Sequence, residues 1–67
     1  MPAHKRFVMR LKQFRVNRGM TQEALAEKAG ISRVYVARLE TGKQDPTLTT
    51  LMKLANALKV KVAELLE

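Results

Sequence analysis

Residues 21–42, TQEALAEKAGISRVYVARLETG, carry the signals for two short helices separated by a tight turn. Thr21 is a good N-cap for the first helix, and Gly30 follows that helix at a position that favours a left-handed backbone. Ile31 and Ser32 repeat the pattern, because Ser32 can cap a second helix while Ile31 packs against its first turn. Two helices joined by so short a glycine turn must cross at a steep angle.

Signals for helix starts and stops continue on both sides of this segment. Gly19, Gly30 and Gly42 each follow a helical pattern and are expected to end helices. Pro46 excludes a helix that runs through it, and Thr47 can cap the next helix. The sequence therefore predicts an all-α fold of five helices, at about residues 5–17, 22–29, 33–41, 48–58 and 62–66.

Apolar residues recur at helical spacing and mark the expected core face of each helix. Phe7, Leu11 and Phe14 follow the i, i+4, i+7 pattern in the first helix. Val36 and Leu39 share one side of the third helix. In the fourth helix, the expected buried stripe consists of Leu48, Leu51, Met52, Ala55 and Leu58.

Length and composition limit the class of protein. A chain of 67 residues has room for one domain with a modest core, so we expect a single domain over residues 1–67. The absence of cysteine excludes disulfides and thiolate metal sites and suits a reducing cytoplasm. No apolar run approaches the roughly 18 residues of a membrane span, and no signal peptide pattern is present. We therefore expect a cytoplasmic protein.

Positive charge is concentrated near the N-terminus. The chain has 13 Lys and Arg against 6 Asp and Glu, for a formal net charge of +7. Residues 1–22 contain no acidic residue, and their basic residues are Lys5, Arg6, Arg10, Lys12, Arg15 and Arg18. Such a basic face on a small domain indicates a nucleic acid or an anionic membrane as partner. The alternative is a charged helix surface that only keeps the protein soluble.

The chain resembles the phage-repressor and Cro type of helix-turn-helix domain, with the helix-turn-helix unit at about residues 21–42. The resemblance implies a compact five-helix, repressor-like domain that binds specific double-stranded DNA and regulates transcription, with residues 33–41 in the major groove. Only the last helix departs from the pattern, because Lys61 is a poor N-cap. The matching positions are Leu11, Phe14, Arg15, Gly19, Thr21, Gln22, Leu25, Ala26, Gly30, Ser32, Val36, Leu39, Glu40, Gly42, Pro46, Thr47, Leu48, Leu51, Leu54, Ala55, Leu58, Val60 and Leu65.

The third helix carries the residues expected to contact DNA bases. Val34, Ala37 and Arg38 lie opposite its core side, and Arg33 is free at its first turn. An arginine can donate two hydrogen bonds to guanine O6 and N7, and Val34 would complement a thymine methyl group. The small Ala37 side chain allows a close approach. The alternative is that the arginines serve solubility and that an isolated surface valine needs no explanation.

Other polar residues are expected to contact the phosphate backbone, which positions the protein without reading sequence. Thr21 and Gln22 begin a helix, where free N–H groups attract a phosphate, and the resemblance implies this role for Gln22. Capping by Thr21 and Ser32 is compatible with such a contact, whereas partial burial is the rival explanation for Tyr35. The full set of expected phosphate contacts is Thr21, Gln22, Ser32, Tyr35, Thr41 and Lys43.

Two opposite charges lean toward the expected core. Arg15 lies four residues after Leu11, and Glu40 lies four residues after Val36. This placement predicts a partly buried ion pair that joins the first and third helices, and the resemblance implies the same bond. Its role would be structural, and its net contribution to stability would be small because desolvation offsets the attraction. Two unpaired surface charges are the alternative.

The C-terminal segment supplies more apolar side chains than a small core needs. Val60, Val62, Leu65 and Leu66 are expected to form a dimer interface, some of them exposed on the monomer. A homodimer would read a palindromic operator with half-sites about 10–10.5 base pairs apart. The alternative is that these side chains merely cap the core, so that dimerisation occurs only on DNA.

No pattern in the chain indicates an enzyme. His4 is the one histidine and Ser32 the one serine, which leaves no basis for a Ser-His-Asp arrangement. No cluster with metal-ligand spacing and no glycine-rich phosphate loop is present, so neither a metal nor a cofactor is expected. The alternative function is a protein-interaction module on the same fold, either an antitoxin subunit or a bridging coactivator, with a protein partner. A membrane-surface peptide fits the basic first helix but not the caps and the periodic core, so no membrane partner is expected.

Overall fold

A computed structural model describes residues 2–67, with side chains described from residue 5 onward. These residues form five helices and no strand, which confirms the expected all-α fold. The helices are α1 (Pro2–Asn17), α2 (Gln22–Ala29), α3 (Arg33–Glu40), α4 (Leu48–Leu58) and α5 (Val62–Leu66). Within residues 2–67, no helix is long and apolar enough to cross a membrane.

Two helix boundaries differ from the expectation. Helix α1 begins at Pro2 rather than at Lys5. Proline is favoured at the first helical position because its fixed φ suits the helix and its missing N–H would have no helical partner there. Helix α3 ends at Glu40, and Thr41 is its cap residue, with φ −98° and ψ 0°.

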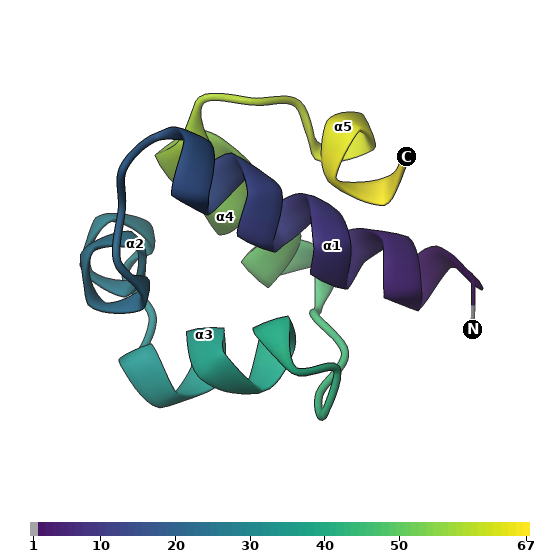
Figure 1. Cartoon of the computed structure of the whole chain (residues 1–67), viewed down its shortest axis with the longest axis horizontal. Helices are drawn as coiled ribbons and strands as arrows, with labels where there is room; N and C mark the ends of the chain where they lie inside the picture. Colours follow the sequence, from purple (N-terminus) through teal and green to yellow (C-terminus); the bar gives the residue numbers. More distant parts are fainter. Residues whose placement is uncertain (1) are drawn as a thin grey trace.

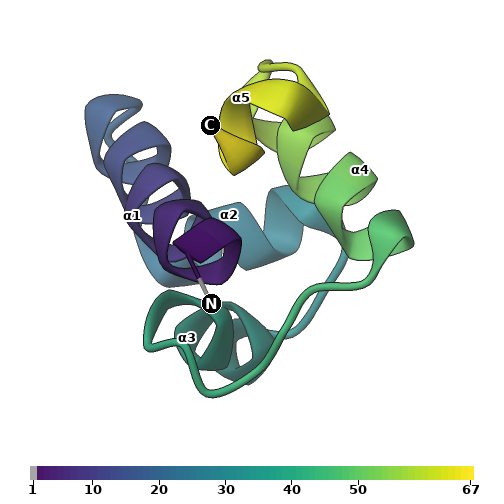
Figure 2. The ribbon, with the colours of Figure 1, turned by 90° about the vertical axis from the view of Figure 1, so that its right-hand side faces the viewer.

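The helices are arranged around α1, which crosses the middle of the molecule in Figure 1. Helix α3 packs against α1 and α2, while α5 packs against α1 and α4. Figures 1 and 2 both show α3 along the lower edge of the molecule, with α5 on the opposite side. This arrangement leaves an outer surface of α3 that no other helix covers in either view.

All five helices contribute to one hydrophobic core. Its largest fully buried side chains are Phe7, Leu11, Leu25, Val36, Leu39, Leu54, Leu58 and Leu65. The expected core positions in α1 and α3 are therefore confirmed, with Phe14 half-buried against the core.

The expected buried stripe of α4 is partly wrong. Leu48 and Met52 are 69% and 57% exposed, whereas Leu54 is fully buried. At 100° per residue, Met52 points almost opposite to Leu54, so both cannot face the same core. Apolar residues occur on both sides of this helix, and packing against α2 and α5 selects the side that contains Leu54 and Leu58.

Four of the helices end in the same hydrogen-bonded turn. The first or second residue after the helical segment has a left-handed backbone, and the next N–H donates to the carbonyl five residues earlier. The expected glycine stops are confirmed, with φ of 66° at Gly19, 75° at Gly30 and 76° at Gly42. The fourth turn uses Lys59, with φ 58°. The closing bonds are Met20 to Arg15 (3.1 Å), Ile31 to Ala26 (3.0 Å), Lys43 to Arg38 (3.0 Å) and Val60 to Ala55 (2.9 Å).

Side chains also fix where the helices begin. The hydroxyl oxygens of Thr21, Ser32 and Thr47 accept hydrogen bonds from the N–H groups of Ala24, Tyr35 and Thr50 respectively, at 3.0–3.1 Å. Helix α5 begins differently, because the N–H of Lys61 donates to Glu64 Oε2 at 2.8 Å. The acidic residue one turn along thus compensates for the poor capping side chain of Lys61.

Candidate nucleic-acid interface

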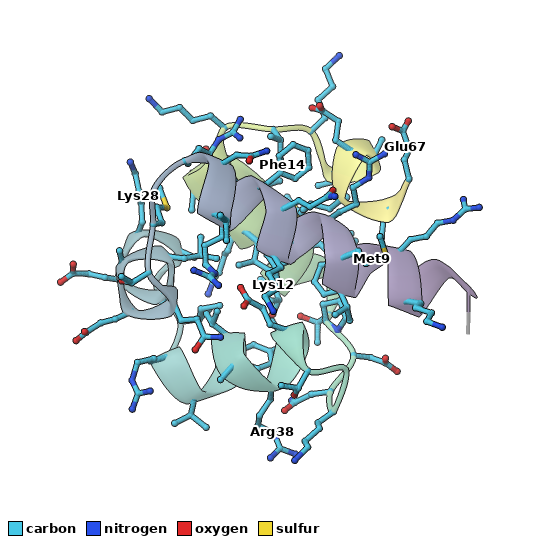
Figure 3. All side chains as sticks on the ribbon, in the orientation of Figure 1. Met9, Lys12, Phe14, Lys28, Arg38 and Glu67 are labelled. Carbon is cyan, nitrogen blue, oxygen red and sulfur yellow. The ribbon has the colours of Figure 1, made fainter. Side chains whose placement is uncertain are left out.

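The outer face of α3 is exposed to solvent because the opposite side of the helix is buried in the core. Val36 and Leu39 are 0% exposed, and Ser32 caps the first turn of the helix. Val34 is 60% exposed, and both Arg33 and Arg38 are exposed. Figure 3 shows Arg38 at the lower edge of the molecule, on the outer side of α3.

The exposed residues of α3 and the turn after it surround one shallow hollow. The volume of this hollow is about 250 Å³. Its lining consists of Arg33, Val34, Ala37, Arg38, Thr41 and Lys43, and we call this set the α3 surface. The structure thus brings together all the residues predicted to contact bases and two of those predicted to contact phosphates.

Arg38 is held by the turn that follows α3. Its Nε donates to Gln44 Oε1 at 3.0 Å, and its carbonyl accepts hydrogen bonds from Thr41 Oγ1 at 3.1 Å and from the N–H of Lys43 at 3.0 Å. The sequence reasoning missed Gln44, because a residue in an irregular loop has no periodicity to reveal its partner. The glycine stop at Gly42 was the one available signal that the chain reverses here.

The predicted phosphate contacts in α2 and α3 differ in their surroundings. Thr21 and Ser32 are exposed residues, and their hydroxyl oxygens cap α2 and α3. Gln22 is half-buried and its Nε2 donates to Glu40 Oε1 at 3.0 Å. Tyr35 is also half-buried, with its hydroxyl 3.1 Å from Thr50 Oγ1 on α4. Tyr35 therefore joins α3 to α4, in agreement with the rival explanation of partial burial.

A hydrogen-bonded ion pair lies behind the α3 surface. Arg15 Nε is 2.6 Å from Glu40 Oε2, and Arg15 Nη2 is 3.1 Å from Glu40 Oε1. The exposed fractions of the two side chains are 12% and 2%. Arg15 Nη1 also donates to the carbonyl of Met20 at 2.7 Å, and Gln22 adds a bond to Glu40. The network joins α1, the turn after it, α2 and the end of α3.

The four apolar residues predicted at a dimer interface have different environments. Val60 and Val62 are half-buried and pack against the core, and Leu66 is 42% exposed. Leu65 is 0% exposed, which corrects its expected place at a surface. Helix α5 packs against α1 and α4, so Leu65 on its inner side enters the core while the next residue points outward.

Helix α1 carries an exposed apolar stripe that the sequence reasoning did not identify. Met9 and Val16 are 59% and 58% exposed. They lie beside Val8, Lys12, Gln13, Asn17 and Glu40 around a hollow of about 510 Å³. Their spacing of seven residues, separate from the core positions of α1, is the signal that could have found them.

The side chain of His4 lies outside the described residues. Among the described side chains, no group of three or more His, Cys, Asp or Glu is placed to hold a metal ion. Ser32 Oγ accepts the capping bond from Tyr35.

Known proteins similar to this chain are named as transcriptional regulators or repressors. A family model described as "Helix-turn-helix" matches residues 11–65. An uncharacterized HTH-type transcriptional regulator of Archaeoglobus fulgidus is 39% identical over 56 residues, which are 84% of this chain and 80% of that protein. The immunity repressor protein of Bacillus phage phi105 is 44% identical over 54 residues. That match covers 81% of this chain but only 38% of the repressor.

A solved structure has the same arrangement of helices. The restriction-modification controller protein C.AhdI from Aeromonas hydrophila matches with a TM-score of 0.87 and 38% sequence identity. The match covers 90% of this chain and 91% of the controller protein. None of the three proteins is named as an enzyme.

Proposed function

We propose that this chain, which belongs to the helix-turn-helix family of the phage-repressor and Cro type, is a transcriptional regulator. It would read double-stranded DNA with α3 in the major groove. The family and the named relatives point to a DNA-binding regulator. The observation that carries the finer proposal is the α3 surface, where Arg33, Val34, Ala37 and Arg38 line one hollow. An α-helix fits into the major groove, and its exposed side chains then reach the base edges.

Different chemistry is assigned to the residues of the α3 surface. Arg33 and Arg38 would each donate two hydrogen bonds to a guanine, while Val34 would contact a thymine methyl group. Ala37 lies between them and keeps the centre of the surface shallow. Both arginines are exposed in the described structure, so no buried contact has to break before they bind.

The phosphate contacts would surround this base-reading centre. Thr41 and Lys43 border the same hollow as Arg38, and Thr21 and Ser32 are exposed at the starts of α2 and α3. Free N–H groups at these helix starts favour an anion. We expect weaker phosphate contacts from Gln22 and Tyr35, because their polar atoms already bond to Glu40 and Thr50.

We further propose one domain over residues 1–67 that acts in the cytoplasm and pairs as a homodimer on a palindromic operator. One helix reads only a few base pairs, and so short a binding site occurs many times in a genome. A second copy of the chain would supply the missing specificity. The half-exposed apolar side chains of Val60, Val62 and Leu66 support a contact through the region of α5.

Selection of bound sites from random DNA tests the proposal. We expect enriched sequences that contain an inverted repeat, with half-sites about 10–10.5 base pairs apart. Binding to the selected duplex should exceed binding to random duplexes and should weaken with salt. Weak binding with no preferred sequence would contradict the proposal and favour the protein-interaction module.

A further inference from the structure

The turn after α3 is tied to Arg38 through its backbone. The left-handed backbone of Gly42, with φ 76°, reverses the chain just beyond the helix. The carbonyl of Arg38 then accepts hydrogen bonds from the Lys43 N–H at 3.0 Å and from Thr41 Oγ1 at 3.1 Å. These bonds fix the path of the turn, so residue 44 lies beside the side chain of Arg38.

The side chain of Gln44 completes this arrangement. Its Oε1 accepts a hydrogen bond from Arg38 Nε at 3.0 Å. A guanidinium has five N–H donors, and this bond uses the one nearest the aliphatic stem. The terminal Nη1 and Nη2 groups keep their donors, in the planar fork that matches guanine O6 and N7.

We propose that Gln44 is a positioning residue that orients the guanidinium of Arg38 for end-on recognition of guanine. The inference rests on the proposed function, since it assumes that Arg38 reads a base. A long arginine side chain must give up many rotamers when it binds. The hydrogen bond to Gln44 already restricts the guanidinium, so Arg38 loses less conformational entropy when it binds the DNA. Its contact with guanine then contributes more to the discrimination between bases.

The exposure of this pair separates a positioning role from a role in folding. Both Arg38 and Gln44 are exposed, so water competes with their hydrogen bond in the free protein and the bond adds little to the stability of the fold. In the major groove, less water would reach the pair and the same bond would become stronger. Loss of Gln44 Oε1 should therefore reduce the discrimination between DNA sequences while the melting temperature remains unchanged.

The test compares two substitutions at position 44. Gln44→Met keeps the length of the side chain but removes the acceptor, whereas Gln44→Glu keeps an acceptor for Arg38 Nε. Binding is measured on the selected duplex, on the same duplex with the guanine pair replaced, and on a random duplex. Gln44→Met should reduce the discrimination about two- to tenfold, the range for one hydrogen bond, without weakening binding to the random duplex.

Gln44→Glu should preserve the discrimination while it weakens binding to every duplex, because its charge repels phosphates. Gln13→Met, an exposed substitution on α1, is the matched control and should change neither quantity.

A double-mutant cycle with Arg38→Ala completes the experiment. In the Arg38→Ala background, Gln44→Met should have no further effect on discrimination, since the group that it orients is absent. An equal effect of Gln44→Met in both backgrounds, or unchanged discrimination on a site that the unmodified chain clearly prefers, would overturn this inference alone. If the unmodified chain prefers no sequence, the proposed function fails and this inference fails with it.

Discussion

At the scale of single residues, Arg38 and Lys43 border the same hollow but are assigned different tasks. We expect Arg38→Ala to weaken specific binding by about 1–3 kcal/mol and to relax the preference at one base pair, because a bidentate contact to guanine is lost. Lys43→Ala should weaken binding to all sequences about equally and reduce the slope of affinity against salt by roughly 1. Gel shifts with specific and random duplexes measure both. Equal losses on the two duplexes for Arg38→Ala would show that Arg38 reads no base.

We assign the ion pair between Arg15 and Glu40 to the stability of the fold rather than to DNA contacts. Their side chains are 12% and 2% exposed, so removal of one partner leaves a buried charge without its counterion. We expect Arg15→Met and Glu40→Met each to lower the free energy of unfolding by about 3–5 kcal/mol. The double mutant should lose less than the sum of the two, because it leaves no unpaired charge.

Thermal melts of the two single mutants and the double mutant measure this coupling. Lys12→Met removes an exposed charge from the same helix and is the control, with an expected change within about 0.5 kcal/mol. Small and additive losses at positions 15 and 40 would mean that the pair does not support the fold.

At the scale of elements, the turns that end the helices differ in how well their residues suit them. Three of the four left-handed positions are glycine, but the turn after α4 places Lys59 at φ 58°. A side chain raises the energy of this conformation, so Lys59→Gly should stabilise the protein by about 0.5–1 kcal/mol. Chemical denaturation measures the change.

Lys59→Ala separates relief of the backbone from loss of the lysine side chain. It removes most of the side chain but retains Cβ, so it should give little of the stabilisation. The reverse change, Gly30→Ala, should destabilise by about 1 kcal/mol although no atom lies within 4 Å of the added Cβ, because φ there is 75°. Equal effects of the two Lys59 variants would rule out backbone strain as the cause.

At the scale of the whole molecule, we propose different binding partners for two faces. Helix α3, which we propose to bind DNA, and helix α5, which we propose to contact a second chain, lie on opposite sides of the molecule in Figures 1 and 2. We expect two protein chains per palindromic duplex at saturation. Leu66→Glu should weaken binding of the second chain, because it places a charge where a 42% exposed leucine would be covered by the partner.

Sedimentation at micromolar protein, with and without the duplex, counts the bound chains. Val16→Glu on α1 is the matched control, since Val16 is also exposed, at 58%, and lies outside the α5 region. One chain per duplex at saturation, on a selected site without an inverted repeat, would exclude the homodimer.

The sequence by itself determined the five helices and the division of α3 into two faces. Caps such as Ser32 and stops such as Gly30 act within one turn of the backbone, so their effect can be read from neighbouring residues. In α3, Val36 and Leu39 share one side while both arginines lie away from it, so the burial of Val36 and the exposure of Arg38 follow from helical periodicity.

Only the tertiary structure decided which apolar residues of α4 and α5 are buried, and which loop residue lies beside Arg38. Met52 and Leu54 are both apolar, and packing against neighbouring helices buries Leu54 and leaves Met52 exposed. Leu65 is buried in the same way, because α5 packs against α4 and against α1, which is distant in sequence. The bond from Arg38 to Gln44 depends on the path of an irregular turn. These outcomes follow from contacts between segments, whereas a sequence pattern reports the preferences of each segment alone.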